Sequence, residues 1–440
     1  MEKQKIISIV SLVVIIALFV VTRIVGGNRS SETAPDVTEA PTEVAKNTTK
    51  APTKAPTKVP TETAKPTEAP ANTPVPTKAP TEAPTPSADP TPTPTPSPSP
   101  VPTAAPAPTL SPEHIATARA VMEKMTVEEK IYQLFLVTPE QLTGIKPVTG
   151  ANDRVKEAIR NKPVGGLLFA AQNVNNKDQL TALLSGSAEA SKYGLFLTVQ
   201  DETGALTAPA GTAKIAKASE LGGDASIAAA AAAALGKDLR ALGFNLNLAP
   251  VSDLSKDGAS FGTDAKIVSD MVAAYVKAGA SAGLPGVLLH FPIHSTEKST
   301  RSLKDLQAAE FTVFQSGINS GASIVMVGYA EMRGLSDRKA PASLNPDVIG
   351  ILRKELGFSG IVMTEAMDAK TITGHYDSDK VAVMAIQAGA DIIYRPADLN
   401  NAYKGISNAV KNGTISEERL NESVLRILAV KAQYGILKQQ

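Results

Sequence analysis

The 440-residue sequence contains no cysteine and no tryptophan. Without cysteine the chain has neither a disulfide framework nor thiolate ligands for a metal. Without tryptophan, only tyrosine, phenylalanine and histidine rings can stack on a flat ligand. The formal net charge is +1, with 44 basic and 43 acidic residues. A nucleic-acid partner, which would require a strongly basic face, is therefore not expected.

Proline is abundant but unevenly distributed, since about two-thirds of the 32 prolines precede Glu113. Residues 30–112 form a low-complexity tract of proline, threonine, alanine, lysine and glutamate, with repeats such as KAPTKAPTKVP and PTPTPTPSPSP. Such a tract has too few apolar residues to offset chain entropy and favours extended polyproline conformations. We expect a disordered linker over 30–112 and a globular domain over 113–440.

The first residues contain an apolar stretch, Ile6 to Thr22, that carries no charge over 17 residues. This length is at the lower limit for a membrane-spanning helix. No small-x-small cleavage site follows it, so residues 1–29 are interpreted as an uncleaved membrane anchor; a cleaved signal peptide is the alternative. Both interpretations predict export. The first places the protein in the cell membrane as a single-pass protein with its globular domain outside, on the cell-wall side.

Eight short apolar runs alternate with helical stretches after residue 113. The runs are 133–138, 164–170, 195–200, 244–251, 286–292, 322–329, 360–366 and 390–396. They do not alternate polar and apolar residues, as expected for parallel strands buried on both faces. Eight strand-then-helix units predict an α/β fold of the (β/α)8 TIM-type barrel class. An open doubly wound sheet is the alternative, but no GxGxxG or P-loop motif follows any run.

The segment 342–368 indicates where the chemistry of this domain lies. Its sequence, ASLNPDVIGILRKELGFSGIVMTEAMD, predicts an amphipathic helix followed by a short buried strand that ends at Glu365. In a barrel enzyme the active site lies at the C-terminal ends of the strands. Glu365 is therefore a candidate catalytic or binding carboxylate, and a structural carboxylate is the alternative.

Several motifs resemble glycoside hydrolase family 3, and in particular its bacterial β-N-acetylhexosaminidase branch. They are GFNLNLAPVSD (243–253), SFG (260–262), LHFPIH (289–294), the segment 342–368, AIQAGADIIYRP (385–396) and the closing helix RLNESVLRILAVKAQYGIL. The resemblance implies a barrel over 113–440 that acts on carbohydrate. In active members an Asp is the nucleophile, and a His oriented by an Asp two residues before it is the acid/base. Here Glu365 occupies the nucleophile position.

This chain departs from the family pattern at most charged positions of the site. The sugar-holding Asp, two Arg, a Lys, a Gly and a His of relatives fall on Gln200, Ala205, Ala259, Leu289, Ile293 and Tyr329. The segment STEKSTRSLKD after His294 contains no Asp-x-His pair, so the acid/base of the family is missing. By resemblance, the substrate-binding candidates are Gln200, Asp253, His290 and Tyr329, and His294 is a weak candidate acid.

The remaining histidines and the cofactor question complete the site expectations. His290 and His294 are four residues apart, but a proline separates them and the segment is not a helix, so this spacing gives no reason to expect a metal site. His114 and His375 are expected to be structural or surface residues. No cofactor is expected.

Three functions remain open from the sequence. The first is a monomeric cell-surface domain directed at N-acetylglucosamine-containing or cell-wall glycans, with peptidoglycan fragments as possible ligands and catalysis impaired or lost. The second is an active retaining glycoside hydrolase that uses Glu365. The third is a non-catalytic module that binds a protein at the wall.

Overall fold

A computed structural model describes residues 110–438 of the chain. The expected anchor (1–29) and nearly all of the expected linker (30–112) lie outside these residues. Within the described part, no helix has both the length and the apolar character needed to cross a membrane.

The eight expected strands are all present, and all pair in parallel. They are β1 (Phe135–Val137), β2 (Gly166–Leu168), β3 (Phe196–Val199), β4 (Leu246–Asn247), β5 (Gly286–Phe291), β7 (Ala322–Val327), β9 (Ile361–Thr364) and β10 (Ile393–Tyr394). One sheet has the order β10-β1-β2-β3-β4 and another has the order β5-β7-β9. Single bridges from Val251 to Leu289 and from Met363 to Ile392 join the two sheets into a ring. The barrel prediction is therefore confirmed, and the open-sheet alternative is wrong.

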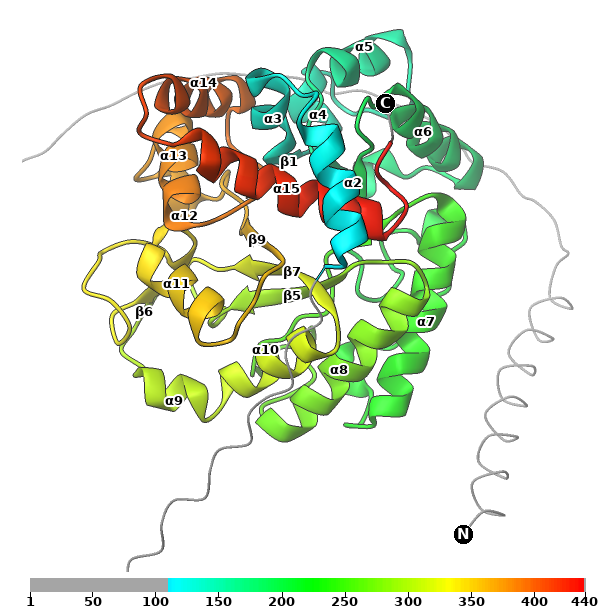
Figure 1. The fold of residues 1–440 in the computed structure, drawn as a ribbon. Coiled ribbons are helices and arrows are strands. Elements are labelled where there is room, and N and C mark those ends of the chain that lie inside the picture. Colours follow the sequence, from blue (N-terminus) through cyan, green and yellow to red (C-terminus); the bar gives the residue numbers. More distant parts are fainter. Residues whose placement is uncertain (1–109, 439–440) are drawn as a thin grey trace, which may run out of the picture. The chain divides into compact units, whose positions relative to one another are not determined.

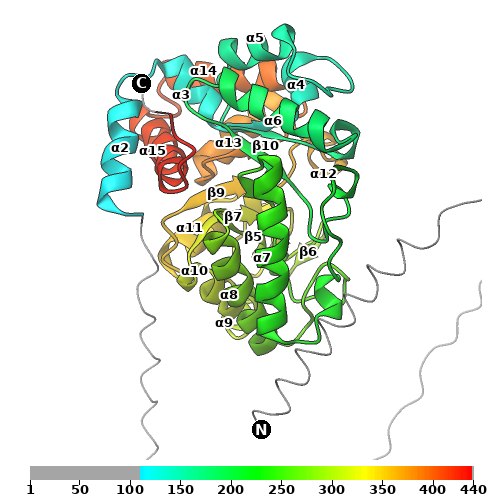
Figure 2. The ribbon, with the colours of Figure 1, turned by 90° about the vertical axis from the view of Figure 1, so that its right-hand side faces the viewer.

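The helices lie outside the ring of strands (Figure 1, Figure 2). They are α2 (Pro112–Met122), α3 (Val127–Gln133), α4 (Pro139–Thr143), α5 (Asp153–Asn161), α6 (Lys177–Ala190), α7 (Ala225–Leu242), α8 (Ala265–Ser281), α9 (Leu303–Gln307), α10 (Glu310–Asn319), α11 (Pro346–Lys354), α12 (Lys370–Thr373), α13 (Ser378–Ala388), α14 (Leu399–Lys411) and α15 (Glu417–Gln433). Two short strands, β6 (Lys298–Ser299) and β8 (Glu331–Met332), pair separately from the barrel.

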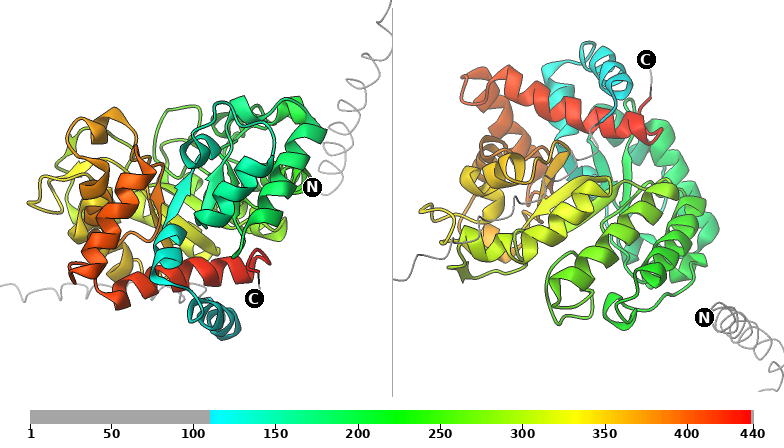
Figure 3. Two further views of the ribbon diagram at one scale, coloured as in Figure 1. Left: turned by 90° about the horizontal axis from the view of Figure 1, so that it is seen from above. Right: turned by 60° about the horizontal axis from the view of Figure 1, so that its bottom comes forward.

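Helix α7 illustrates how the sequence sets these elements. The side chain of Asp224 caps its first turn by accepting the backbone N–H of Ser226, and Gly243 ends it with φ of 105°, a left-handed conformation that favours glycine. Its apolar face contains mostly alanine and leucine, whose small and medium side chains allow close packing against α8. Figure 3 shows α7, α8 and α10 in succession along one flank of the barrel.

Helix α15 crosses the end of the barrel where the strands begin. Its buried Lys431 donates to the side-chain oxygen of Gln133 and to the carbonyl of Gly194, which precede β1 and β3. Helix α2 packs against α15, and the two lie side by side in Figures 1 and 2. Both helices therefore cover the end of the barrel opposite to the C-terminal ends of the strands.

A buried ionic cluster lies at the same end and is centred on Asp391, which is fully buried just before β10. Its carboxylate accepts from Arg353 at 2.7 Å, from Arg426 at 3.0 Å and from the Ser423 hydroxyl at 2.6 Å. The guanidinium of Arg419 lies 3.6 Å away. Burial opposes the charged form of this carboxyl, but the three arginines outweigh it and lower its pKa.

Candidate active site

A cavity of about 480 Å³ opens where the barrel strands end. Its walls come from the segments that follow β3, β4, β5, β9 and β10. The lining residues are Gln200, Glu202, Val251, Asp253, Ser255, Asp257, Ala259, Ser260, His290, His294, Met326, Glu365, Ala366, Tyr394 and Arg395. Five of the six residues predicted as site candidates thus share one cavity, and Tyr329 is the exception. A cavity of this size accommodates a small organic ligand.

Glu365 directly follows β9, as expected, and its carboxyl faces the cavity. Its backbone N–H donates to the carbonyl of Val327 at 3.0 Å, which continues the pairing of β7 with β9. The side-chain oxygen Oε2 is buried and has no hydrogen-bond partner. Burial raises the pKa of Glu365 to about 7, although the nearby His290 partly opposes this rise. A large fraction of this carboxyl is therefore protonated at neutral pH.

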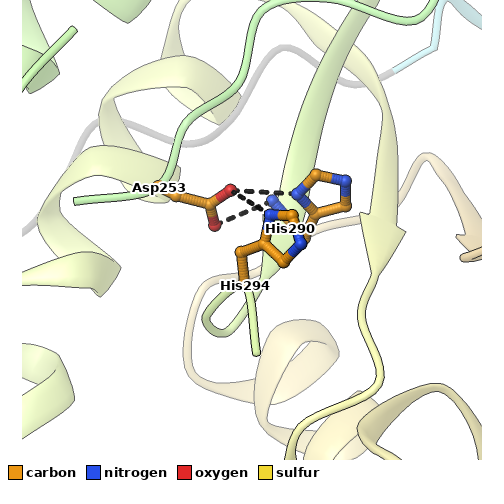
Figure 4. A group of neighbouring side chains, drawn as sticks. All are labelled: Asp253, His290 and His294. Carbon is orange, nitrogen blue, oxygen red and sulfur yellow. Dashed lines mark hydrogen bonds and ion pairs between the residues drawn. The ribbon is translucent and has the colours of Figure 1, made fainter. Parts of the chain in front are cut away.

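Asp253 and His290 form a buried pair on neighbouring strands (Figure 4). The Asp253 Oδ2 lies 2.9 Å from His290 Nδ1, and Oδ1 accepts the backbone N–H of His290 at 3.1 Å. The bridge between Val251 and Leu289 brings the two residues together, since Val251 lies two residues before Asp253 and Leu289 lies one residue before His290. Burial disfavours a charged His290, but the hydrogen bond and the charge of Asp253 outweigh burial and raise its pKa.

His294 lies in the loop after β5 and turns back toward the same carboxylate. Its Nδ1 is 3.7 Å from Asp253 Oδ2, and its ring centre is 4.4 Å from that of His290. Half of its side chain is exposed. Burial of the other half and the neighbouring His290 lower its pKa, which leaves the imidazole neutral at pH 7. A neutral imidazole cannot protonate a leaving group.

Gln200 and Asp201 follow β3 and differ in exposure and in contacts. Gln200 is exposed and lines the cavity. Asp201 is buried, and its carboxylate accepts from the Thr207 hydroxyl at 2.8 Å and from the Thr207 backbone N–H at 2.9 Å. Asp201 therefore holds its own loop, and it does not replace the acidic residue that relatives carry at the position of Gln200.

Three charged residues of the cavity were missed by the sequence analysis: Glu202, Asp257 and Arg395. Burial raises the pKa of Glu202 to about 7, and the charges of Asp257 and Asp201 contribute to the rise. Arg395 follows β10 with φ of 48° and pairs with Asp368 at 2.7 Å. Its position after the run ADIIY was a usable signal, because strand ends carry the site in a barrel.

Tyr329 does not line the cavity that contains Glu365, although the two residues are close: burial and the nearby Glu365 raise the pKa of the Tyr329 hydroxyl. Its hydroxyl donates to the carbonyl of Ala366, and its ring lines a neighbouring cavity of about 660 Å³. The other residues of that cavity are Thr296, Glu297, Lys298, Glu331, Lys339, Pro341, Thr371, His375 and Tyr376. Helix α12 ends before His375, so this exposed histidine lies in the connection to α13, as a surface residue would. His114 bonds to Ser111 in the first turn of α2, as a structural residue would.

Ala259 and Leu289 stand where the family pattern has an arginine and a lysine, and their surroundings suit apolar side chains. Ala259 lines the cavity, and Leu289 is fully buried in the core. The segment after His294 forms β6 and then the cap of α9, where Ser302 and Asp305 bond to each other. Among the lining residues Arg395 is the single lysine or arginine, and it is already paired.

Sequence comparison identifies related proteins. Residues 126–430 match the Glycosyl hydrolase family 3 N terminal domain. A β-N-acetylglucosaminidase/β-glucosidase of Cellulomonas fimi is 27% identical over 363 residues, which cover 74% of this chain and 61% of the relative. A secreted, uncharacterized glycosyl hydrolase of Arthroderma benhamiae is 28% identical over 306 residues, or 61% of this chain and 85% of that protein.

Solved structures of similar fold agree with this relationship. A family 3 β-N-acetylglucosaminidase from Paenibacillus sp. has a TM-score of 0.66 and 27% identity, covering 71% of this chain and 63% of its own. A family 3 glycosyl hydrolase from Mycobacterium smegmatis has a TM-score of 0.62 and 26% identity, covering 70% and 98%. The chain thus spans about three-fifths of the Cellulomonas and Paenibacillus proteins. The ring of eight strands, the cavity at their ends and these matches together place the chain in glycoside hydrolase family 3.

Proposed function

We propose that the barrel binds glycans that contain N-acetylglucosamine in the cavity around Glu365 and hydrolyses them poorly or not at all. The missing acid/base carries this proposal, since no Asp-x-His pair follows His294. The nucleophile position adds a smaller effect, because a nucleophilic carboxyl must be ionised to attack a sugar carbon and burial raises the pKa of Glu365 to about 7. The names of the relatives, which include β-N-acetylglucosaminidases, supply the ligand class.

The polar groups of the cavity suit binding better than catalysis. Gln200 and the Asp253–His290 pair offer donors and acceptors for sugar hydroxyls. The apolar side chains at Ala259 and Leu289 cannot supply the charge-assisted bonds that would tighten in a transition state. Loss of such bonds lowers the rate more than it lowers the affinity for the ground state.

The acid function is also weak at neutral pH. His294 is neutral there because its pKa is lowered, and no Asp-x-His pair is present between residues 294 and 304. Loss of a general acid typically costs about 10²–10⁴-fold in rate. Substrates with poor leaving groups, such as natural glycans, depend most on this acid.

One observation favours the alternative of an active retaining hydrolase. Glu202 lines the same cavity, and its pKa is raised to about 7, the value that suits a general acid at neutral pH. In this alternative Glu365 attacks the sugar carbon and Glu202 protonates the leaving oxygen. Raised pH would ionise Glu365 but also remove the proton of Glu202, so the rate would pass through a maximum near pH 7.

The test compares hydrolysis with binding for the full chain and for Glu365→Asp, Glu365→Ala and Glu202→Gln. We expect no turnover of chitobiose or muropeptides by the native chain, only faint release from dinitrophenyl N-acetylglucosaminide, and no rescue by Glu365→Asp. Calorimetric titration with N-acetylglucosamine oligomers should nevertheless show saturable binding. Robust turnover of chitobiose that Glu365→Ala abolishes would overturn the proposal of impaired catalysis. A loss of this turnover in Glu202→Gln as well would support the alternative of an active hydrolase.

We also propose that the barrel is tethered to the outside of the cell membrane and reaches cell-wall glycans. The proposal rests on the uncharged stretch Ile6 to Thr22 and on the proline-rich tract 30–112, whose composition suits a long extended spacer. Cell fractionation tests it. The full chain should sediment with membranes and be accessible to external protease, whereas a chain that lacks residues 1–29 should stay in the soluble fraction.

A further inference from the structure

Three side chains with metal-binding atoms meet at one wall of the cavity. Asp253 follows β4, His290 lies in β5, and His294 lies in the loop after β5. Their potential ligand atoms all lie within 4.8 Å of one another. Figure 4 shows both imidazole rings beside the Asp253 carboxylate. The family resemblance places all three residues at the site, but the spacing of the two histidines gives no reason to expect a metal there, and Asp253 lies far from them along the chain.

Two of the three side chains are buried and held in place, and the third is half exposed. The side chains of Asp253 and His290 are 5% and 8% exposed, and two contacts between the residues orient them. His294 is 50% exposed and can shift toward or away from them. A metal site needs preorganised ligands, and a mobile third ligand lets an ion enter from solvent.

The distances suit a tetrahedral ion. Zinc lies about 2.0–2.2 Å from nitrogen and oxygen ligands, so its tetrahedral ligand atoms are about 3.3–3.6 Å apart. The Asp253 Oδ2 lies 2.9 Å from Nδ1 of His290 and 3.7 Å from Nδ1 of His294, values on either side of that range. All the potential ligand atoms lie within 4.8 Å of one another, so a shift of the half-exposed His294 would bring the three groups to coordination distance.

The charge of the cavity also favours a cation. Asp253 and Asp257 line it, and Glu202 and Glu365, whose pKa values are both about 7, add negative charge as they ionise. The single lysine or arginine of the lining, Arg395, is already paired with Asp368. A concave site lined by one sign of charge concentrates counter-ions.

We propose that Asp253, His290 and His294 bind a divalent transition-metal ion of the zinc class. Two imidazoles and one carboxylate are a ligand set that such ions prefer, and three protein ligands leave the fourth position open. That position faces the cavity, where a water molecule or a sugar hydroxyl can occupy it. This site goes beyond the proposed glycan binding and does not rest on it.

The small number of histidines and the absence of cysteine allow a specific test of this site. The chain has no cysteine, and His114 and His375 are its other two histidines. The double variant His114→Ala/His375→Ala therefore leaves the cluster as the only imidazoles. We would titrate the full chain, purified in mild detergent with a tag that contains no histidine, with ZnCl₂ by calorimetry and with CoCl₂ by visible absorption.

We expect one saturable equivalent of zinc and the visible bands of four-coordinate cobalt, both retained in the double variant. His294→Ala should weaken zinc binding by at least tenfold and remove the bands, because it deletes one of three ligands. His294 is half exposed, so this variant should keep the native melting temperature. Absence of saturable zinc binding, or unchanged binding in His294→Ala, would overturn the proposal. Loss of glycan binding with zinc binding intact would overturn only the proposed function.

Discussion

Each end of the barrel holds a carboxylate with a buried oxygen, and the surroundings of the two are opposite. At the end where strands begin, Asp391 is fully buried among three arginines and the Ser423 hydroxyl, and its pKa is lowered. At the end where strands finish, Glu365 is partly buried, its buried Oε2 has no hydrogen-bond partner, and its pKa is raised. One carboxylate is fully compensated by its neighbours and the other is not.

The difference separates stability from function. Residues at the N-terminal end of a barrel commonly serve stability, whereas those at the C-terminal end serve chemistry. A carboxyl with an unpartnered buried oxygen costs folding free energy, and a native protein tolerates this cost chiefly at a functional site. We infer by this criterion that the cavity around Glu365 serves a function, even though several polar residues of the family are absent from it.

The largest loss of stability should come from removing Asp391, whose charge is balanced by the neighbouring arginines. Asp391→Ala should lower the free energy of unfolding by about 3–5 kcal/mol, because it leaves the partly buried guanidinium groups of Arg353 and Arg419 without a counter-charge, whereas Arg426 keeps Glu422. Urea unfolding followed by circular dichroism measures this loss. The matched control is Asp347→Ala, which removes a half-exposed carboxylate that pairs with Arg338 and accepts from the Ser336 hydroxyl, and it should cost about 1 kcal/mol. Equal losses in the two variants would contradict the role assigned to the cluster.

Substitution of Glu365, at the other end of the barrel, should raise the stability and not lower it. The folded-state pKa of Glu365 is raised from 4.5 to about 7, so its protonated form stabilises the fold. This contribution is complete below pH 4.5 and is lost as the pH rises through 7. Glu365→Gln keeps a neutral side chain at all pH values. At pH 8 it should therefore be more stable than the native chain, by at most about 3 kcal/mol, with the difference vanishing at pH 4.

Thermal unfolding of both chains between pH 4 and pH 8 checks this. Glu297→Gln, a change at an exposed position, is the control and should follow the native chain throughout. A Glu365→Gln variant that is less stable than the native chain at pH 8 would show that the carboxylate has a partner in solution.

A smaller effect is expected from one hydroxyl of the Asp391 cluster. Ser423→Ala removes the hydroxyl that donates to Asp391 at 2.6 Å and accepts from Arg419 at 2.7 Å, but it leaves the arginines in place. The expected loss is about 1.5–3 kcal/mol, the usual range for hydrogen bonds to charged groups. A double-mutant cycle with Asp391→Ala should show strong coupling, and simple additivity would count against a direct contact.

The sequence was sufficient to predict the barrel and to name most of the candidate residues that share its cavity. Buried apolar runs mark parallel strands, the strand-end rule located Glu365, and the family resemblance gave Gln200, His290 and Asp253. The same rule fits Arg395, which was missed because resemblance, and not position, guided the choice of residues. Glu202 was missed for a similar reason, since attention went to the residue that replaces the family's Asp at position 200.

The orientation of side chains around the ring was not predictable. Tyr329 follows β7 as expected, but its hydroxyl turns to the Ala366 carbonyl and its ring faces the neighbouring cavity. The meeting of Asp253 with both histidines depends on the bridge from Val251 to Leu289. Pairing between strands of adjacent barrel units is set by packing in three dimensions, which spacing along one chain does not encode.

The packing of α2 against α15 also sets where the described part of the chain begins. Ser111 caps the start of α2, and α15 lies across the end of the barrel where strands begin. The first described helix therefore lies at the end of the barrel opposite to the cavity. Neither α2 nor α15 obstructs the mouth of the cavity, so a long polymer can approach it without meeting these two helices.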